Sequence, residues 1–214
     1  MTFVAISDTH NIHTPMHLPD GDVLIHAGDV TGKGTEAQVY HFLEWFSAQP
    51  HRHKIFIAGN HDFYFELAQP ERIAAMIPDN LIYLNDSGVT IEGIKIWGSP
   101  IQPWFFDWAF NRKRGADIKK HWDLIPNDTD ILIIHGPAYK RLDRVIRGNE
   151  AVGCVDLLKA IERVEPKFFI CGHIHEAYGV IEEEKTTFIN ASVLNENYKM
   201  SNKPIVFEME KKPQ

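Results

Sequence analysis

Histidine, aspartate and asparagine side chains directly follow five hydrophobic runs of the chain. Each run has the length and the apolar character of a buried β-strand. Carboxylate oxygen, amide oxygen and imidazole nitrogen are donors that hard and borderline divalent cations take in proteins. The candidate metal ligands are Asp8, His10, Asp29, Asn60, His135, His173 and His175.

The spacing of these donors suits two ions. Asp8 and His10 are separated by one residue, as are His173 and His175. Alternate residues of an extended chain leave the same side of the backbone, so the two side chains of each pair are expected to face the same way. Asp29 follows Gly28, which allows a tight turn at the end of its strand. The seven donors are enough to bind two divalent ions, and we expect Asp29 to bridge them.

The five hydrophobic runs must place these donors together. The carboxyl ends of parallel strands meet at one edge of a sheet, and α/β folds bind ligands at that edge. Donors that lie far apart in the sequence are therefore expected to converge. The predicted strands are Phe3–Ile6, Val23–Ile25, Ile55–Ile57, Ile131–Ile134 and Phe168–Ile170.

Helical and hairpin patterns surround these strands. Apolar residues spaced i, i+3, i+4 and i+7 from Val39 predict a helix that Pro50 ends. Further helices are expected at about 70–77 and 155–164. Residues 89–96 read as a hairpin that turns at Glu92-Gly93, and β-like runs return at 178–180, 188–190 and 205–207. The expected fold is α/β, with two facing mixed sheets and helices outside, and residues 1–214 are expected to form a single domain because no linker divides them.

The chain resembles the calcineurin-like metallophosphoesterase superfamily. The motifs in order are Asp8-x-His10, Gly28-Asp29, Gly59-Asn60-His61-Asp62, His135 and Gly172-His173-x-His175. The resemblance implies a four-layer α/β/β/α sandwich. It also implies two metal sites. One would take Asp8, His10, Asp29 and His175, and the other would take Asp29, Asn60, His135 and His173.

The resemblance further implies a catalytic role for two residues. His61 would act as the acid near the leaving group, and Asp62 would orient it. Two cations about 3.5–4 Å apart can hold a phosphoryl group and an attacking hydroxide between them. The cations could be manganese, iron or zinc, and the residues leave that choice open.

A closer resemblance is to the small phosphodiesterases related to the animal metallophosphoesterase-domain-containing proteins. It rests on Gly59–Asp62, His135-Gly136-Pro137, Leu142-Asp143-Arg144 and Trp97-Gly98-Ser99-Pro100. It implies hydrolysis of small phosphodiesters, including nucleoside cyclic phosphates. Two alternatives stay open. One is a phosphomonoesterase or promiscuous phosphatase with the same centre, and the other is a metal-stabilised binding module whose hydrolysis is incidental.

Several aromatic, basic and histidine residues allow more than one interpretation. The stretch Trp104–Phe110 could stack a nucleobase, fill the core, or form the contact of a homodimer. Four arginines could grip phosphate or form solvated ion pairs, namely Arg112, Arg114, Arg144 and Arg147. His26 is expected to be buried near Asp29. The histidines expected at the surface are His13, His17, His41, His51, His53 and His121.

The composition limits the partners. A net charge of −7 disfavours a long nucleic acid, whereas a small phosphate ester remains suitable because metal ions make the local field positive. The two cysteines are expected to be buried free thiols. No signal peptide pattern and no apolar run of about 20 residues is present, so we expect a cytoplasmic protein without a membrane partner.

Overall fold

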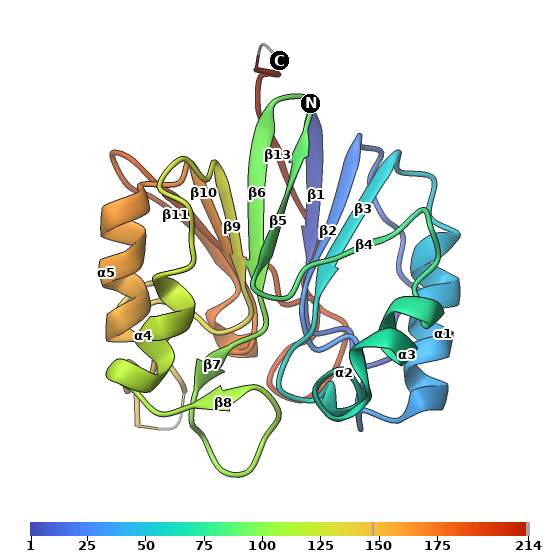
Figure 1. The fold of residues 1–214 in the computed structure, drawn as a ribbon, viewed down its shortest axis with the longest axis horizontal. Coiled ribbons are helices and arrows are strands. Elements are labelled where there is room, and N and C mark those ends of the chain that lie inside the picture. Colours follow the sequence, from blue (N-terminus) through green and yellow to red (C-terminus); the bar gives the residue numbers. More distant parts are fainter. Residues whose placement is uncertain (147, 213–214) are drawn as a thin grey trace.

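The computed structural model describes residues 1–146 and 148–212, and two β-sheets pack face to face within it (Figure 1). The five-stranded sheet contains, in spatial order, β13 (Ile205–Glu208), β1 (Thr2–Ile6), β2 (Val23–Ala27), β3 (His53–Ile57) and β4 (Ile82–Tyr83). The six-stranded sheet contains β11 (Gly179–Glu182), β12 (Thr187–Asn190), β10 (Phe168–Cys171), β9 (Ile131–Ile134), β6 (Ile94–Ser99) and β5 (Ser87–Ile91). Both sheets are mixed, as the sequence predicts.

Helices cover the two outer faces of the sheets. They are α1 (Glu36–Ser47), α2 (Phe63–Leu67), α3 (Pro70–Met76), α4 (Ala116–Trp122) and α5 (Val155–Val164). In Figure 1, α1 to α3 lie beside the five-stranded sheet and α4 and α5 lie beside the six-stranded sheet, so the layers are α/β/β/α. The predicted fold class is confirmed.

Burial on both faces explains why the strands are so apolar. Phe3 and Ala5 of β1 belong to a buried cluster that unites strands of the two sheets. Val4 and Ile6 belong to a second buried cluster, which includes helix side chains such as Phe42. A strand buried on both faces has no solvent side, so its sequence is a continuous hydrophobic run. This pattern is what makes the strand ends easy to locate.

The predicted elements match closely, and the missed ones are short. The helices at α1, α3 and α5 and the β5–β6 hairpin are confirmed. The sequence analysis missed α2 and α4, which have 5 and 7 residues and so are too short for a periodic pattern. It also missed the small ribbon of β7 (Gln102–Pro103) and β8 (Asn111–Arg112).

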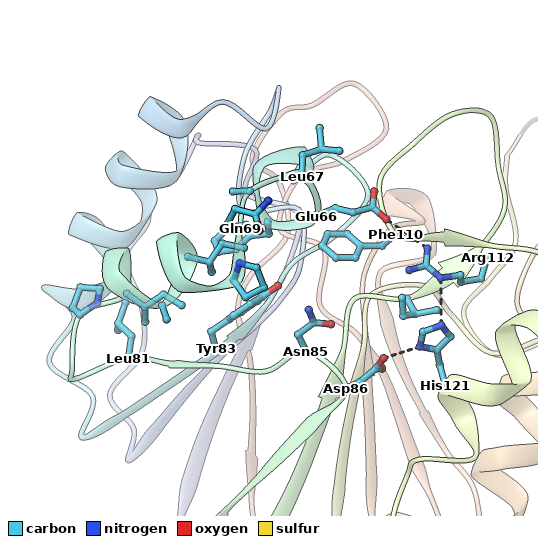
Figure 2. A pocket seen from close by; sticks show the side chains of 18 of the residues that line it. Glu66, Leu67, Gln69, Leu81, Tyr83, Asn85, Asp86, Phe110, Arg112 and His121 are labelled. Carbon is cyan, nitrogen blue, oxygen red and sulfur yellow. Dashed lines mark hydrogen bonds and ion pairs between the residues drawn. The ribbon is translucent and has the colours of Figure 1, made fainter.

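A groove with a volume of about 930 Å³ opens between α2, α3 and α4 (Figure 2). Several of its polar and charged groups bond to one another. His121 Nδ1 lies 2.6 Å from Asp86 Oδ2, and Arg112 Nη1 lies 3.5 Å from Glu66 Oε1. Among the described residues, none of the nine predicted site residues lines this groove. Within the same described part of the chain, no helix combines the length and apolar character that crossing a membrane requires.

Candidate metal centre

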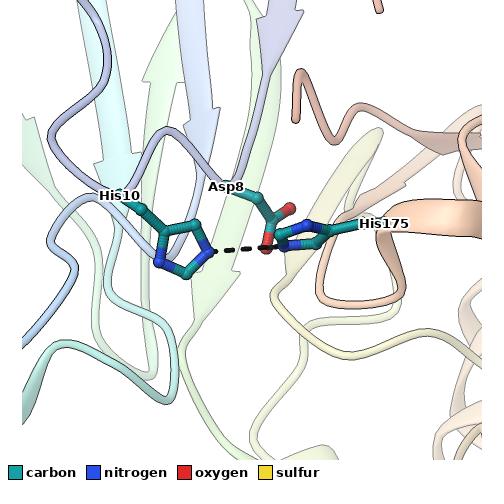
Figure 3. A group of neighbouring side chains, drawn as sticks. All are labelled: Asp8, His10 and His175. Atoms are coloured by element: carbon teal, nitrogen blue, oxygen red, sulfur yellow. Dashed lines mark hydrogen bonds and ion pairs between the residues drawn. The ribbon is translucent and has the colours of Figure 1, made fainter. Parts of the chain in front are cut away.

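The candidate ligands meet at the end of the sheets where β1, β2, β3, β9 and β10 terminate. Three sets of side chains each bring their donor atoms within 4.8 Å of one another; one of them, His10, Asp29 and His61, includes the predicted acid, and the other two contain predicted ligands alone. Of these two, one is Asp8, His10 and His175, shown in Figure 3, and the other is Asp29, His135 and His173. His10 Nε2 lies 3.7 Å from Asp29 Oδ2, which connects the sets. The side chains that the sequence analysis assigned to two ions therefore lie in two adjoining groups.

Asn60 completes the second set. Its Oδ1 lies 2.9 Å from His135 Nε2 and 2.8 Å from His173 Nδ1. An amide oxygen offers lone pairs without adding negative charge. The backbone N–H of His61 donates to Asp29 Oδ1 at 2.8 Å, so the loop after β3 is tied to the loop after β2.

Backbone carbonyls fix how three of the imidazoles face the cluster. Nδ1 of His135 lies 2.9 Å from Ala27 O, and Nδ1 of His175 lies 3.0 Å from Asn195 O. A carbonyl oxygen only accepts, so each Nδ1 carries the proton and leaves Nε2 for the cluster. His61 Nδ1 is bonded to Gly32 O in the same way at 3.0 Å. Such outer hydrogen bonds are typical of histidines that bind metals.

The charges of the cluster also suit divalent cations. Burial alone would raise the pKa of Asp8, but the hydrogen bond and positive charge of His175 hold that pKa well below its usual range. Burial would lower the pKa of His135 and His175, but Asp29 and Asp8 raise each to about 9. The carboxylates thus draw positive charge into a buried space, and metal ions would take the place of these protons. The donor set fits a dinuclear centre.

The backbone is strained where the ligands are. Asp8, His10, Asp29 and His173 adopt positive φ values of 56°, 43°, 52° and 67°. Such values are uncommon for residues with a side chain and cluster at functional sites. Gly172 is required for a different reason, because a Cβ at this position would overlap the carboxylate of Asp8. The strand ends are held in unusual conformations that bring the donors together.

Part of the site comes from a segment that the sequence analysis did not single out. Ser192 Oγ donates to Asp8 Oδ2 at 2.7 Å, and both residues are fully buried. The ring of Tyr198 lies 5.0 Å from that of His10 and 5.1 Å from that of His175. Ser192 lies two residues after Asn190, the last residue of the predicted strand that became β12, so the rule used for the other ligands could have found it. Tyr198 lies in a turn and carries no such signal.

His61 and Asp62 occupy different environments. The His61 imidazole packs on Trp108 with 4.3 Å between ring centroids, and it lies within 4.8 Å of donor atoms of His10 and Asp29. Asp62 is fully buried and accepts hydrogen bonds from Gly59 N and from the Thr31 backbone and hydroxyl. Among the described residues, the ring of His61 bonds to Gly32 rather than to Asp62, so the expected direct orientation of His61 by Asp62 is not seen.

Burial and the charge of Asp29 raise the pKa of Asp62 to about 6. Its hydrogen-bond donors favour the ionised form, so Asp62 is a carboxylate at neutral pH. The ionised carboxylate of Asp62 holds the loop after β2 and the loop after β3 together through its hydrogen bonds to Thr31 and Gly59.

A second pocket, of about 530 Å³, opens over the centre. Asp29, Asn60, His61, His173 and His175 form its metal side. The aromatic stretch supplies another wall, through Trp104, Phe105 and Trp108. Phe110 is buried in the core, so the prediction that it might stack a base is wrong, whereas Trp104 and Phe105 are exposed.

The structure shows the surroundings of several other arginines and histidines that the sequence analysis considered. Arg114 also lines this pocket, and its guanidinium donates to Gly153 O at 2.8 Å and Val152 O at 2.7 Å instead of to a carboxylate. Arg147 lies outside the described residues. His13 and His51 are buried, which corrects the prediction that they lie at the surface. His13 packs on Trp45 of α1 and the ring of His51 lies 3.0 Å from Pro19 O, and neither contact can be seen from the loop context of the two residues in the sequence.

Comparison with known proteins gives consistent matches. The model of the calcineurin-like phosphoesterase family matches residues 1–177. A human protein, metallophosphoesterase domain-containing protein 1, is 44% identical over 229 residues, covering 97% of this chain and 70% of its own length. A UPF0046 protein of Caenorhabditis elegans is 41% identical over 221 residues, covering 98% of this chain and 75% of its own. One solved crystal structure, 15% identical, shares the fold with a TM-score of 0.62 over 88% of this chain and 89% of the other.

Proposed function

Because the chain belongs to the calcineurin-like phosphoesterase family, we propose that it is a dinuclear metal-dependent phosphodiesterase. Its substrates would be small phosphodiesters such as nucleoside cyclic phosphates. The observation that carries the proposal is the pair of adjoining donor sets at the floor of one pocket. A non-catalytic binding module would not need His61 in the same pocket.

We assign the ligands as the family pattern does. Asp8, His10 and His175 would hold one ion, and Asn60, His135 and His173 would hold the other. Asp29 would bridge the two, since it lies 3.7 Å from His10 Nε2 and 3.4 Å from His135 Nε2. When bound, two divalent cations would neutralise phosphoryl oxygens and lower the pKa of water.

Residues of the chain would supply the proton for the leaving group and hold its donor in place. As an imidazolium, His61 would deliver its Nε2 proton to the departing oxygen and keep the Nδ1 proton, which Gly32 O accepts. General acid help of this kind is worth about 10²–10⁴ in rate. Trp108 packs on the imidazole and keeps its plane fixed. The carboxylate of Asp62 keeps the loop of His61 in register with that of Asp29.

Two features favour a diester over a monoester. A diester carries one negative charge, whereas a monoester carries close to two above a second pKa of about 6. The chain has a net charge of −7, so the more charged ester meets more repulsion outside the metal pocket. The exposed Trp104 and Phe105 and the partly buried Trp108 offer flat apolar surface to a base or aryl group.

The test is a substrate comparison on protein reconstituted with Mn²⁺. The value of kcat/KM is measured for a nucleoside 2′,3′-cyclic phosphate, bis(4-nitrophenyl) phosphate and 4-nitrophenyl phosphate. We expect both diesters to exceed the monoester. A monoester preferred by about tenfold or more would overturn the diesterase assignment. In parallel, Asp29→Asn should reduce the metal content from about two ions per chain. A wild-type protein that saturates at one ion, with the variant unchanged, would remove the bridge.

A further inference from the structure

Tyr198 brings a phenol to the metal side of the pocket from beyond the matched family region. It lines the pocket together with Asp29, His61 and His175. Its ring packs against the imidazoles of His10 and His175 at 5.0 Å and 5.1 Å. These are the two histidines assigned to one ion. The side chain remains 49% exposed, so a ligand in the pocket can reach it.

A built turn holds Tyr198 in this place. Asn195 Oδ1 accepts from the backbone N–H groups of Asn197 at 3.0 Å and Lys199 at 3.1 Å. The N–H of Tyr198 donates to Asn195 O at 2.8 Å. Tyr198 itself has a φ of 56°, which a bulky residue rarely adopts.

The same turn is connected to the centre. Asn195 O accepts the Nδ1 proton of His175, so one peptide both orients a candidate ligand and positions Tyr198. The placement of the phenol relative to the cluster is thus fixed by backbone hydrogen bonds rather than by a flexible loop.

The hydroxyl of Tyr198 is an uncommitted donor. Among the described residues it makes no hydrogen bond, whereas the guanidinium of Arg114, also in this pocket, is bonded to two carbonyl oxygens. A tyrosine hydroxyl is protonated at neutral pH and can donate one hydrogen bond. Phosphate esters present oxygens that accept such bonds.

We propose that Tyr198 is a substrate-binding residue that donates a hydrogen bond from its hydroxyl to a phosphate oxygen of the ester, beside His10 and His175. The inference rests on the proposed function and adds a specific contact to it. The contact would be made to the bound ester and to the product phosphate alike. Its loss should therefore raise KM and weaken phosphate binding more than it lowers kcat.

The experiment compares Tyr198→Phe with the wild-type protein, both loaded with Mn²⁺. Titration calorimetry measures the affinity for inorganic phosphate, and a second titration of metal-free protein measures the affinity for Mn²⁺. We expect phosphate binding to weaken about tenfold, as the loss of one hydrogen bond to a charged group predicts, with Mn²⁺ affinity unchanged. KM for bis(4-nitrophenyl) phosphate should rise by a similar factor. Tyr40→Phe, at an exposed tyrosine of α1, is the matched control.

The outcomes separate the contact from the function. Phosphate affinity within twofold of wild type would overturn the role of Tyr198 while leaving the hydrolase assignment intact. Weaker phosphate binding together with weaker Mn²⁺ binding would also overturn it, because the ring would then act through its neighbours His10 and His175. A wild-type protein that binds phosphate but hydrolyses no ester would contradict the proposed function and keep the contact. A wild-type protein that binds no phosphate would overturn the contact, and its hydrolysis of bis(4-nitrophenyl) phosphate would decide the proposed function separately.

Discussion

The position of Asp8 depends on donors that come from distant parts of the chain. The N–H of His173 lies 3.0 Å from both carboxylate oxygens, and Ser192 Oγ donates to Oδ2. The carboxylate is fully buried, so its orientation is set by these bonds rather than by water. A ligand that binds metal through one oxygen needs its other lone pairs satisfied, and Ser192 serves this purpose here.

Replacement of Ser192 by alanine should weaken metal binding. The variant removes one hydrogen bond to Asp8 and creates little empty volume. We expect the affinity for Mn²⁺ to fall about 10–100-fold, as is typical for residues that orient metal ligands. Calorimetric titration of metal-free protein measures it. Ser201→Ala, at an exposed serine of the same segment, is the control. An affinity for Mn²⁺ within twofold of wild type would show that Ser192 has no influence on the ligand.

His61 can be separated from the ligands by the leaving group. His61→Ala should lower kcat about 10²–10⁴-fold for a diester whose leaving group is a sugar alkoxide. With a nitrophenolate, which needs little protonation, the loss should be much smaller. The metal content should remain that of the wild type.

Two results would contradict this role for His61. An equal loss on both esters would exclude the acid role. A loss of metal would make His61 a ligand, which its closeness to His10 and Asp29 permits.

At the scale of elements, the candidate ligands lie at the junctions where strands end and loops begin. The sequence located β1, β2, β3, β9 and β10 because both faces of each are buried and their hydrophobic runs are unbroken. Polar residues after such runs are easily seen. This reasoning predicts the candidate ligands, and the structure brings them together.

The walls of the pocket could not be predicted in the same way. Tyr198 lies in a turn, and Trp104 and Trp108 lie around the ribbon of β7 and β8, where no period of hydrophobicity exists. Their positions depend on tertiary contacts, such as the packing of Trp108 on His61. The sequence could show that aromatic residues were concentrated there but not which of them reach the pocket.

The ribbon gives a prediction of its own. Trp108 lines the pocket over the centre, whereas Phe106 is 66% exposed and is absent from the described lining of that pocket. Trp108→Ala should raise KM for a nucleoside cyclic phosphate about tenfold, since stacking on a base is worth about 1–3 kcal/mol. Phe106→Ala should leave KM unchanged. If both variants bind the nucleotide as the wild type does, this stretch serves packing alone.

At the scale of the whole molecule, the apolar layers also enclose histidines that bind no candidate ion. His26 lies inside the β2 strand and its Nε2 is 2.9 Å from Thr9 Oγ1. His13 is fully buried, stacks on Trp45 with 4.5 Å between ring centroids, and lies 4.8 Å from His41. Both nitrogens of His13 lack a partner among the described residues. Burial first, and the charge of His41 second, lower its pKa to about 4.

The stability of the fold should therefore fall in mild acid. An unfolded histidine has a pKa of about 6.5, so below that pH the unfolded chain takes up a proton that folded His13 refuses. The stability is complete above pH 6.5 and is lost as the pH falls toward 4. For His13 alone the loss at pH 5 is about 2 kcal/mol.

Thermal unfolding of metal-free protein, with EDTA present at every pH, measures this effect without interference from metal binding. His13→Phe keeps a ring on Trp45 but cannot titrate, so its Tm should fall less between pH 7 and pH 5 than that of the wild type. His17→Phe changes an exposed histidine that water solvates in both states, and it should keep the wild-type slope. An equal change of Tm with pH in the wild type and His13→Phe would mean that protonation of the buried imidazole does not destabilise the fold. The acid sensitivity would then come from other groups, such as His26, whose pKa burial lowers to about 3, and the residues of the centre.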